Sequence, residues 1–177
     1  MLKKIVAADL ELIRNWRNSD AVSRYMEYRE YITEKMQEEW FEKINNENNL
    51  YFLIEVGERP LGLICGAQID WAYNKVGNAG IFIADDRDRE AGFALEASVL
   101  LNDFAFSIGI ETIFIKVLHD NKRAIAYNKL LGYQLLGDQE SVYNQRYVLS
   151  KQAYTRGRKQ IEPYLKYGDA FHVNAGI

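Results

Sequence analysis

The spacing of apolar residues predicts that the first third of the chain is helical. Leu10, Ile13 and Trp16 fall on one face of a helix, and the polar residues 18–20 interrupt that face. Thr33 is a typical N-cap, and the run TEKMQEEWFEKI that it opens places its large apolar side chains on one side. We therefore expect two helices before the first long strand.

The middle of the chain changes to a strand pattern. The β-rich run 50–56, the turn GERP at 57–60 and the apolar run 61–71 predict a hairpin. Residues 73–78 have the composition of a turn, and residues 80–84 predict another short strand.

The second half alternates between helix and strand patterns. We expect these elements over residues 90–107 (helix), 112–118 (strand), 121–131 (helix), 133–137 (strand) and 145–150 (strand). Gly109 stands where a helix C-terminal cap belongs, and Asn121 or Asp120 is the expected N-cap of the second helix. The order predicts an α/β domain with a mixed sheet, helices on both faces and at least one parallel crossover.

Length and composition are those of one globular domain. The chain has 177 residues, 48% of them hydrophobic and 27% charged. We expect a single domain over 1–177, with a core at about 8–150 and a C-terminal extension, 151–177, whose aromatic residues follow no clear period. The formal net charge of −3 argues against a nucleic-acid partner, and the basic run RGRK (156–159) has the character of a solvated patch.

Cysteine and histidine usage predicts neither a disulfide framework nor a metal site. Cys65 is the single cysteine and lies in an apolar run, which is typical of a buried, unreactive thiol. His119 and His172 lie far apart. No segment has the form of a signal peptide or of a membrane span, so we expect a cytoplasmic protein without a membrane partner.

The stretch DDRDREAGFALE (85–96) leads from a predicted strand through Gly92 into a predicted helix. A helix start offers backbone N–H groups without internal partners, and small residues allow an anion to approach them. A plain polar turn and a phosphate cradle both fit this stretch. Neither a P-loop nor a dinucleotide-binding glycine motif is present.

Two motifs resemble those of the GNAT superfamily of N-acetyltransferases. Residues 89–94 (REAGFA) match the family's Q/R-x-x-G-x-G/A loop, and residues 121–133 (NKRAIAYNKLLGY) are similar to its later block N-x-x-(A/S)-I-x-x-x-x-K-x-G-(F/Y). The resemblance covers about residues 8–150 and is strongest at 79–137. It implies a single-domain GNAT fold, with a mostly antiparallel sheet and a V-shaped splay between strands 80–84 and 112–118, and acetyl-CoA as cosubstrate without a metal.

The resemblance also implies which residues bind the cosubstrate. The backbone of Ile81, Phe82 and Ile83 would pair with pantetheine. The pyrophosphate loop would consist of Arg89, Glu90, Ala91, Gly92, Phe93 and Ala94. The later block would contribute Asn121, Ala124 and Lys129. A helix-capping role for Asn121 is equally compatible with its position, and both roles can hold at once.

Chemistry in this family is direct attack of a neutral amine on the thioester, with no covalent enzyme intermediate. The family's usual tyrosine acid stands seven residues after the asparagine, but here that position holds Asn128, and Tyr127 comes one place earlier. One helical residue turns a side chain by about 100°. Tyr127 as the acid and Asn128 as an amide contact to pantetheine or thiol therefore both stay open. For the base, Asp70 and Glu55 are candidates by location alone.

The N-terminal third is expected to select the acceptor. It resembles two GNAT branches, one acting on ribosomal-protein N-termini and one on nucleotide-linked amino-sugars of the pseudaminic-acid type. In the second interpretation Arg17, Tyr25 and Met26 contact the substrate, with Arg17 meeting a diphosphate. In the alternative, Trp16 and Met26 are plain core and Arg17 forms a structural ion pair.

These observations favour an N-acetyltransferase acting on a small-molecule amine, an amino-sugar nucleotide ahead of a protein N-terminus. A non-catalytic acyl-CoA-binding module stays open because of the departure at Asn128. So does an unrelated domain in which residues 85–96 are a turn. The chain is expected to be a monomer or a homodimer.

Overall fold

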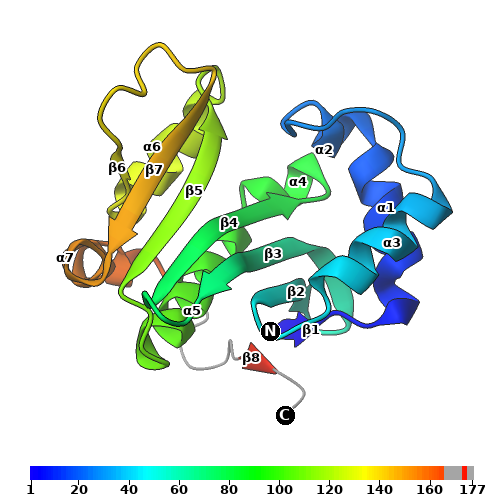
Figure 1. Cartoon of the computed structure of the whole chain (residues 1–177), viewed down its shortest axis with the longest axis horizontal. Helices are drawn as coiled ribbons and strands as arrows, with labels where there is room; N and C mark the ends of the chain where they lie inside the picture. Colours follow the sequence, from blue (N-terminus) through cyan, green and yellow to red (C-terminus); the bar gives the residue numbers. More distant parts are fainter. Residues whose placement is uncertain (166–172, 175–177) are drawn as a thin grey trace.

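A mixed β-sheet organises the chain, of which the computed structural model describes residues 1–165 and 173–174 (Figure 1). The eight strands of these residues lie in the order β6-β7-β5-β4-β3-β2-β1-β8. The strands are β1 (Leu2–Lys4), β2 (Asn49–Val56), β3 (Arg59–Asp70), β4 (Lys75–Ile83), β5 (Thr112–Leu118), β6 (Gln134–Leu135), β7 (Asn144–Ser150) and β8 (Val173–Asn174). The α-helices are α1 (Leu10–Asn18), α2 (Asp20–Ser23), α3 (Glu34–Ile44), α4 (Asp86–Arg89), α5 (Phe93–Ser107), α6 (Lys122–Leu131) and α7 (Lys151–Ile161), and short 3-10 helices cover Ala7–Asp9 and Glu162–Tyr164.

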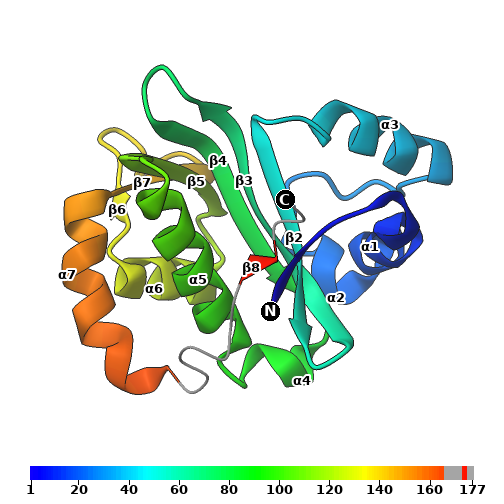
Figure 2. The ribbon, with the colours of Figure 1, turned by 90° about the horizontal axis from the view of Figure 1, so that it is seen from below.

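Most neighbouring strands are antiparallel, and the exceptions in the described residues are the pairs β4–β5 and β1–β8. Helices lie on both faces of the sheet, with α1 and α3 on one side and α5, α6 and α7 on the other (Figure 2). The predicted α/β architecture with a mixed, mostly antiparallel sheet is confirmed.

Strand β2 shows how the two layers are built. Leu53 packs with Ile13 of α1, whereas its neighbours Phe52 and Ile54 pack on the opposite face with Ala97 of α5. Alternate residues of a strand point to opposite faces, and both faces are covered here. The strand is therefore an almost unbroken apolar run.

Strands β4 and β5 pair along only part of their length. Their parallel ladder ends at Ala79 and Ile115, after an irregularity between Val76 and Ala79. Residues 80–83 of β4 and 116–118 of β5 continue beyond this point and diverge (Figure 1). The V-shaped splay expected from the resemblance is present between these two strands.

Several boundaries differ from the sequence prediction. Strand β4 begins at Lys75, so residues 75–78 are strand rather than turn, because they pair with β3 and β5 on both sides. The predicted helix from residue 90 begins at Phe93, after the separate short helix α4. Strand β1 was not predicted. Pairing with neighbouring strands outweighs local propensity both at the start of β4 and in β1.

Three predicted caps are confirmed. The Thr33 hydroxyl accepts a hydrogen bond from the Met36 N–H at 3.3 Å, and the Asn121 side chain accepts one from the Ala124 N–H at 3.1 Å. Gly109, with φ of +99°, follows the end of α5. The boundaries of α3, α5 and α6 near these residues thus have a local chemical cause.

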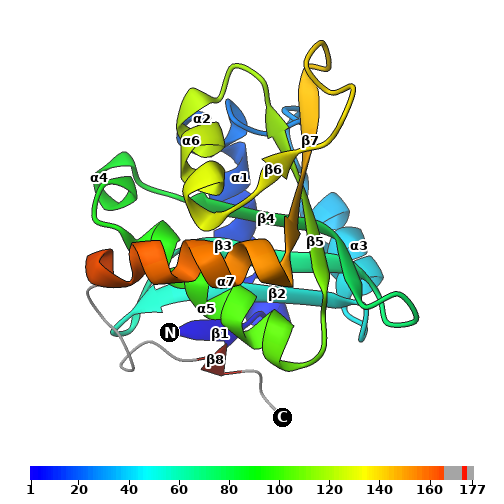
Figure 3. The ribbon, with the colours of Figure 1, turned by 90° about the vertical axis from the view of Figure 1, so that its left-hand side faces the viewer.

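The prediction that the C-terminal extension lacks a period is wrong for residues 151–161, which form α7. Ser150 caps this helix by accepting from the Ala153 N–H at 3.2 Å. Helix α7 passes beside α5 (Figure 3), and its Tyr154 hydroxyl donates to the Asp103 carboxylate of α5 at 2.7 Å. The buried residues of α7 are Ala153, Tyr154, Gly157 and Ile161. Their helical spacing is obscured by the basic residues between them. Residues 166–172 and 175–177 of the extension lie outside the described residues.

Helix α7 approaches the end of α6 closely at Gly157. A Cβ atom there would lie 2.8 Å from the carbonyl oxygen of Leu131. Because backbone cannot yield as a flexible side chain can, we expect Gly157→Ala to lower the free energy of unfolding by about 1–3 kcal/mol. Urea denaturation measures this. The control is Gly137→Ala, where no atom lies within 4 Å, and a change within about 0.5 kcal/mol is expected. Equal midpoints for the two variants would contradict the packing described.

Candidate active site

Ion pairs hold the loop between β4 and α5, and arginine side chains bind the carboxylates of this loop. The Asp85 side chain accepts hydrogen bonds from the Arg87 backbone and guanidinium, and these bonds lower the pKa of Asp85 to about 2. Asp88 accepts two bonds from Arg59 of β3, at 2.7 and 2.9 Å, and these lower its pKa. The carboxylates are therefore neutralised by partners beside a loop expected to receive an anion.

Gly92 forms the N-cap of α5 in the left-handed conformation, with φ of +92° and ψ of −3°. This backbone is strained for any residue with a Cβ atom. A Cβ atom at Gly92 would meet no atom within 4 Å, so the space above it is open. The first-turn N–H groups of a helix lack intrahelical partners and carry its positive dipole end. The start of α5 thus has the shape and the field of an anion site.

Arg89 is a structural clamp rather than a free cation. Its guanidinium donates to the carbonyl oxygen of Ile83 at 3.0 and 3.1 Å, to that of Ala21 at 2.6 Å, and to the Asp86 carboxylate. Its side chain is only 13% exposed. The guanidinium of Arg89 therefore joins the end of β4 to α2. The backbone of Arg89 remains the part predicted to contribute to a phosphate loop.

Arg123 is a cation that the sequence reasoning missed. It lies in the first turn of α6 and donates to the carbonyl oxygen of Arg89 at 2.8 Å. The exposed guanidinium therefore stands against residues 89–94. The signal for Arg123 in the sequence is its place between Asn121 and Ala124, inside the second motif but at a position where the motif specifies no residue type.

The open edge of β4 presents the backbone of alternate residues. The Ala84 N–H donates to Leu61 of β3 at 2.8 Å, and Ile83 stands opposite Gly62 in that ladder. Backbone groups alternate between the two sides of a strand, so those of Ile81 and Ile83 face the splay and those of Phe82 face β3. Arg89 already donates to the Ile83 carbonyl oxygen. Of the three predicted backbone partners, Ile81 and the Ile83 N–H therefore fit best.

The predicted contacts from α6 divide into two groups. Asn121 and Ala124 form the N-terminal cap of α6, on the side where Arg123 reaches residue 89. Lys129 lies in the last turn, where a cation stabilises the negative end of the helix dipole. Glu90, Ala91, Phe93 and Ala94 all lie in the segment around Gly92. Lys129 alone among these predicted residues is remote from the loop.

Tyr127 is directed into the contact between two helices. Its hydroxyl donates to the Ala94 carbonyl oxygen at 2.7 Å and bonds the Ser98 hydroxyl at 2.5 Å, both on α5. Burial raises the pKa of Tyr127 far above its ordinary value. Its ring packs against the core cluster of β5 and α7. The hydroxyl tethers α6 to α5, and this placement argues against Tyr127 as the acid.

Asn128 lies on a different side of α6 from Tyr127. Its side-chain N–H₂ donates to the Ala124 carbonyl oxygen at 2.8 Å, which fixes the amide along the helix. Its side chain is half-buried. The amide remains the predicted contact to pantetheine or thiol.

Arg17 projects from α1 into a partly buried polar cluster on the other face of the sheet. Its Nε atom is buried and has no hydrogen-bond partner among the described residues. Burial lowers the pKa of Arg17, and the nearby Tyr51 and Cys65 act in the opposite direction. The alternative of a structural ion pair for Arg17 finds no partner in the described part of the chain.

The two neighbours of Arg17 are neutral at physiological pH. Burial raises the pKa of the Cys65 thiol to about 11, although hydrogen bonds from the Gly80 backbone and the Tyr51 hydroxyl act against it. Burial likewise raises the pKa of Tyr51. The half-buried Cys65 is therefore a protonated thiol, as the sequence predicted for this position.

Tyr25 and Met26 lie after α2, away from Arg17. The Tyr25 ring stacks with two guanidinium groups, 4.8 Å from that of Arg24 and 5.5 Å from that of Arg89. Met26 is half-buried, and its carbonyl oxygen accepts from Arg29 at 3.0 Å. Tyr25 thus contacts Arg89 of the β4–α5 loop, whereas Arg17 lies near Tyr51 and Cys65, so the structure shows no contact that joins the three predicted substrate residues.

The two base candidates are both wrongly placed. Asp70 ends β3 and lies 3.3 Å from Lys75, at the end of β4 remote from the splay. Glu55 is buried at the β1 side, 3.8 Å from Lys3. Each carboxylate has a structural ion partner, so neither is positioned to take a proton at residues 80–83.

Among the described residues, no three His, Cys, Asp or Glu side chains are grouped so that they could hold a metal ion. In the same part of the chain, no helix has the length and apolar character needed to cross a membrane.

Comparison with protein families decides the identity of the fold. Residues 2–148 match the model of the acetyltransferase (GNAT) domain. The chain belongs to the GNAT family. It is accordingly an N-acetyltransferase that uses acetyl-CoA. A search of curated protein sequences returned no match.

Solved structures share the GNAT fold at low sequence identity. A domain from Methanocaldococcus jannaschii DSM 2661 superimposes with a TM-score of 0.74 at 17% identity, covering 85% of this chain and 97% of its own. Spermidine N-acetyltransferase from Vibrio cholerae, in complex with CoA and spermine, superimposes with a TM-score of 0.73 at 20% identity, covering 88% and 97%. At these identities the likeness establishes the fold alone.

The placement of Tyr127 generates a kinetic prediction. Tyr127→Phe removes a hydroxyl that holds two helices together, so we expect a loss of about 1–2 kcal/mol in unfolding free energy. Because the hydroxyl does not face the splay, kcat should change by less than about threefold at temperatures where the variant is folded. Loss of a general acid would instead lower kcat by about 10²–10⁴-fold. Free-thiol release with urea denaturation separates the two, and a hundredfold fall in kcat would restore the acid role.

Proposed function

We propose that this GNAT enzyme transfers the acetyl group to the primary amine of a nucleotide-linked amino-sugar. The observation that carries the proposal is the buried, unpartnered Nε of Arg17 on the acceptor side. A guanidinium held in this way matches a phosphate or carboxylate oxygen of the acceptor. A polyamine acceptor would instead require carboxylates at that position.

The residues of the splay fit acetyl-CoA on three observations. The β4–β5 ladder ends at Ala79, which leaves a strand edge for an extended amide chain. The start of α5 beyond Gly92 is open and has no Cβ to exclude a pyrophosphate. Arg123 lies against the same loop. When bound, acetyl-CoA supplies an activated thioester carbonyl for attack by the amine.

The chain itself contributes by binding acetyl-CoA and orienting its thioester toward the amine. The β4 edge at Ile81 and Ile83 would align the acyl donor, and the Asn128 amide would contact pantetheine or thiol. Tyr51 and Cys65 stay protonated at neutral pH because burial raises the pKa of each. Neither is therefore suited to accept a proton, and the amine proton would pass to solvent on the open side of the splay. Coenzyme A thiolate is a tolerable leaving group, so no acid is required.

Two other functions can be distinguished from this proposal. A spermidine-type acceptor is suggested only by structural neighbours that are spermidine N-acetyltransferases, and these are 17–21% identical to this chain. A protein N-terminus, or a non-catalytic acyl-CoA-binding module, is compatible with the motifs. The module hypothesis rests on Asn128 standing where the family has tyrosine.

The cosubstrate site is tested by introducing glutamate separately at each end of α5, at Gly92 as the test and at Gly109 as the control. Gly92→Glu places bulk and negative charge in the proposed phosphate cradle, so CoA binding should be abolished in calorimetry. Gly109→Glu introduces the same residue at the same kind of backbone, with φ of +99° and no atom within 4 Å. It carries a similar conformational penalty, and its CoA affinity should stay within about threefold. Retained thiol release in the Gly92 variant would refute the cradle.

The acceptor class is tested by a panel in a free-thiol release assay. We expect turnover with a uridine-diphosphate-linked amino-sugar, and at least tenfold lower kcat/KM with the phosphate-free amino-sugar, spermidine or an N-terminal peptide. Arg17→Gln should raise KM for the nucleotide-linked acceptor about tenfold. CoA binding without turnover on any amine would favour the module, and preference for spermidine would overturn the amino-sugar proposal.

A further inference from the structure

Two cations stand directly opposite each other on neighbouring strands of the far arm of the splay. Lys116 of β5 pairs in register with Arg146 of β7, and both side chains are exposed. Like charges directly opposite in an antiparallel ladder destabilise the sheet. A local violation of this kind is expected at a functional site.

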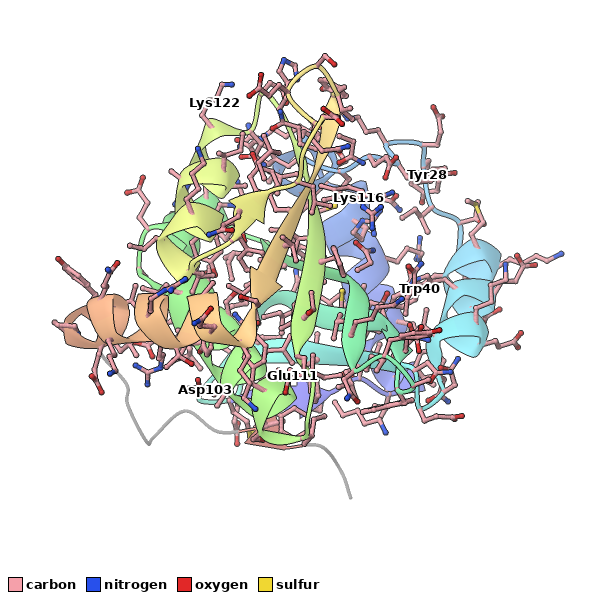
Figure 4. The ribbon with its side chains drawn as sticks, turned by 60° about the vertical axis from the view of Figure 1, so that its left-hand side comes forward. Tyr28, Trp40, Asp103, Glu111, Lys116 and Lys122 are labelled. Atoms are coloured by element: carbon pink, nitrogen blue, oxygen red, sulfur yellow. The ribbon has the colours of Figure 1, made fainter. Side chains whose placement is uncertain are left out.

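Both side chains point to the acceptor side of the sheet. Their neighbours Ile115, Val117 and Tyr147 are buried in the core that β5 and β7 share with α5 and α7. Because strand residues alternate, Lys116 and Arg146 face the opposite side. Lys116 reaches toward the segment after α2, where its Nζ lies 3.9 Å from the Glu27 carboxylate (Figure 4). The pair therefore lies on the β5–β7 arm of the splay, whereas Arg17 lies near Tyr51 of β2 and Cys65 of β3 on the other arm.

The charge of this pair is poorly compensated. The Lys116–Glu27 contact is long, and both side chains are half or more exposed, at 50% and 70%. Arg146 stacks over the Phe114 ring at 5.5 Å and has no carboxylate partner among the described residues. By contrast, the exposed Arg59 holds the Asp88 carboxylate with two short hydrogen bonds. Lys116 and Arg146 thus keep donors available to a ligand.

We infer that Lys116 and Arg146 form an anion subsite that binds the phosphate groups of the acceptor. This inference rests on the proposed function and assigns its specificity to residues that neither motif contains. Arginine offers a planar pair of donors and lysine a point charge, which together match a diphosphate. Phosphate held on the β5–β7 arm and the Arg17 contact on the opposite side would place the acceptor across the mouth of the splay.

The subsite is tested by pyrophosphate binding to enzyme whose CoA pyrophosphate loop (89–94) is already occupied by CoA. CoA binding is measured first, and the enzyme is then saturated with CoA before titration with inorganic pyrophosphate in a calorimeter. Wild type should bind pyrophosphate, and Lys116→Gln/Arg146→Gln should weaken that binding at least tenfold. The control Arg156→Gln/Lys159→Gln removes two exposed charges from α7, on the other face, and should leave the binding unchanged.

Kinetics supply an independent readout. The Lys116/Arg146 double variant should raise KM for the diphosphate-linked acceptor about tenfold or more, with kcat and the kcat/KM for the phosphate-free amino-sugar within about twofold. Failure of wild type to bind CoA would refute the proposed function. Normal CoA binding with no pyrophosphate binding to wild type, or equal loss in the α7 control, would overturn the subsite alone.

Discussion

The separation of β4 from β5 is the constraint on which the rest of the structure depends. Beyond Ala79 and Ile115 the two strands give up their ladder, and unpaired backbone groups are costly unless a ligand or solvent satisfies them. Helix α5 stabilises the divergent arrangement because it packs against both arms of the sheet. Ala97 and Leu101 join the core of β1–β4, whereas Val99, Ala105 and Phe106 join that of β5 and β7. One helix therefore holds both arms while their strands part.

Arg89 connects the two functional sides of this framework. One guanidinium bonds the last carbonyl of β4 and the Ala21 carbonyl of α2, and its backbone carbonyl accepts from Arg123 of α6. The segment that carries Tyr25 and Met26 is thereby fixed to the loop that carries Gly92. Acceptor-side and cosubstrate-side elements share one buried cation, so their relative position is set before either ligand binds.

Local chemistry could be predicted from the sequence where a single residue determines it. Thr33, Asn121 and Gly109 cap their helices as expected, and Gly92 stands at the start of α5. The direction of a side chain could not be predicted where packing decides it. The RxxGxA pattern does not reveal that the Arg89 guanidinium is satisfied internally, and the one-residue shift at Tyr127 becomes interpretable only when Ala94 and Ser98 are seen beside it.

The acceptor side shows why overall charge is a poor guide to a ligand. The chain carries a formal net charge of −3. The buried Nε atom of the partly buried Arg17 nevertheless has no hydrogen-bond partner among the described residues, and Lys116 and Arg146 face each other across a ladder. Strand register, which composition does not contain, brings Lys116 and Arg146 together, and the packing of α1 on the sheet brings Arg17 near Tyr51 of β2 and Cys65 of β3. Carboxylates elsewhere, such as Asp85 and Asp88, are bound by their own arginines. Uncompensated positive charge therefore lies on the open side of the splay, although the molecule as a whole is acidic, and this local charge is what favours the proposed anionic acceptor.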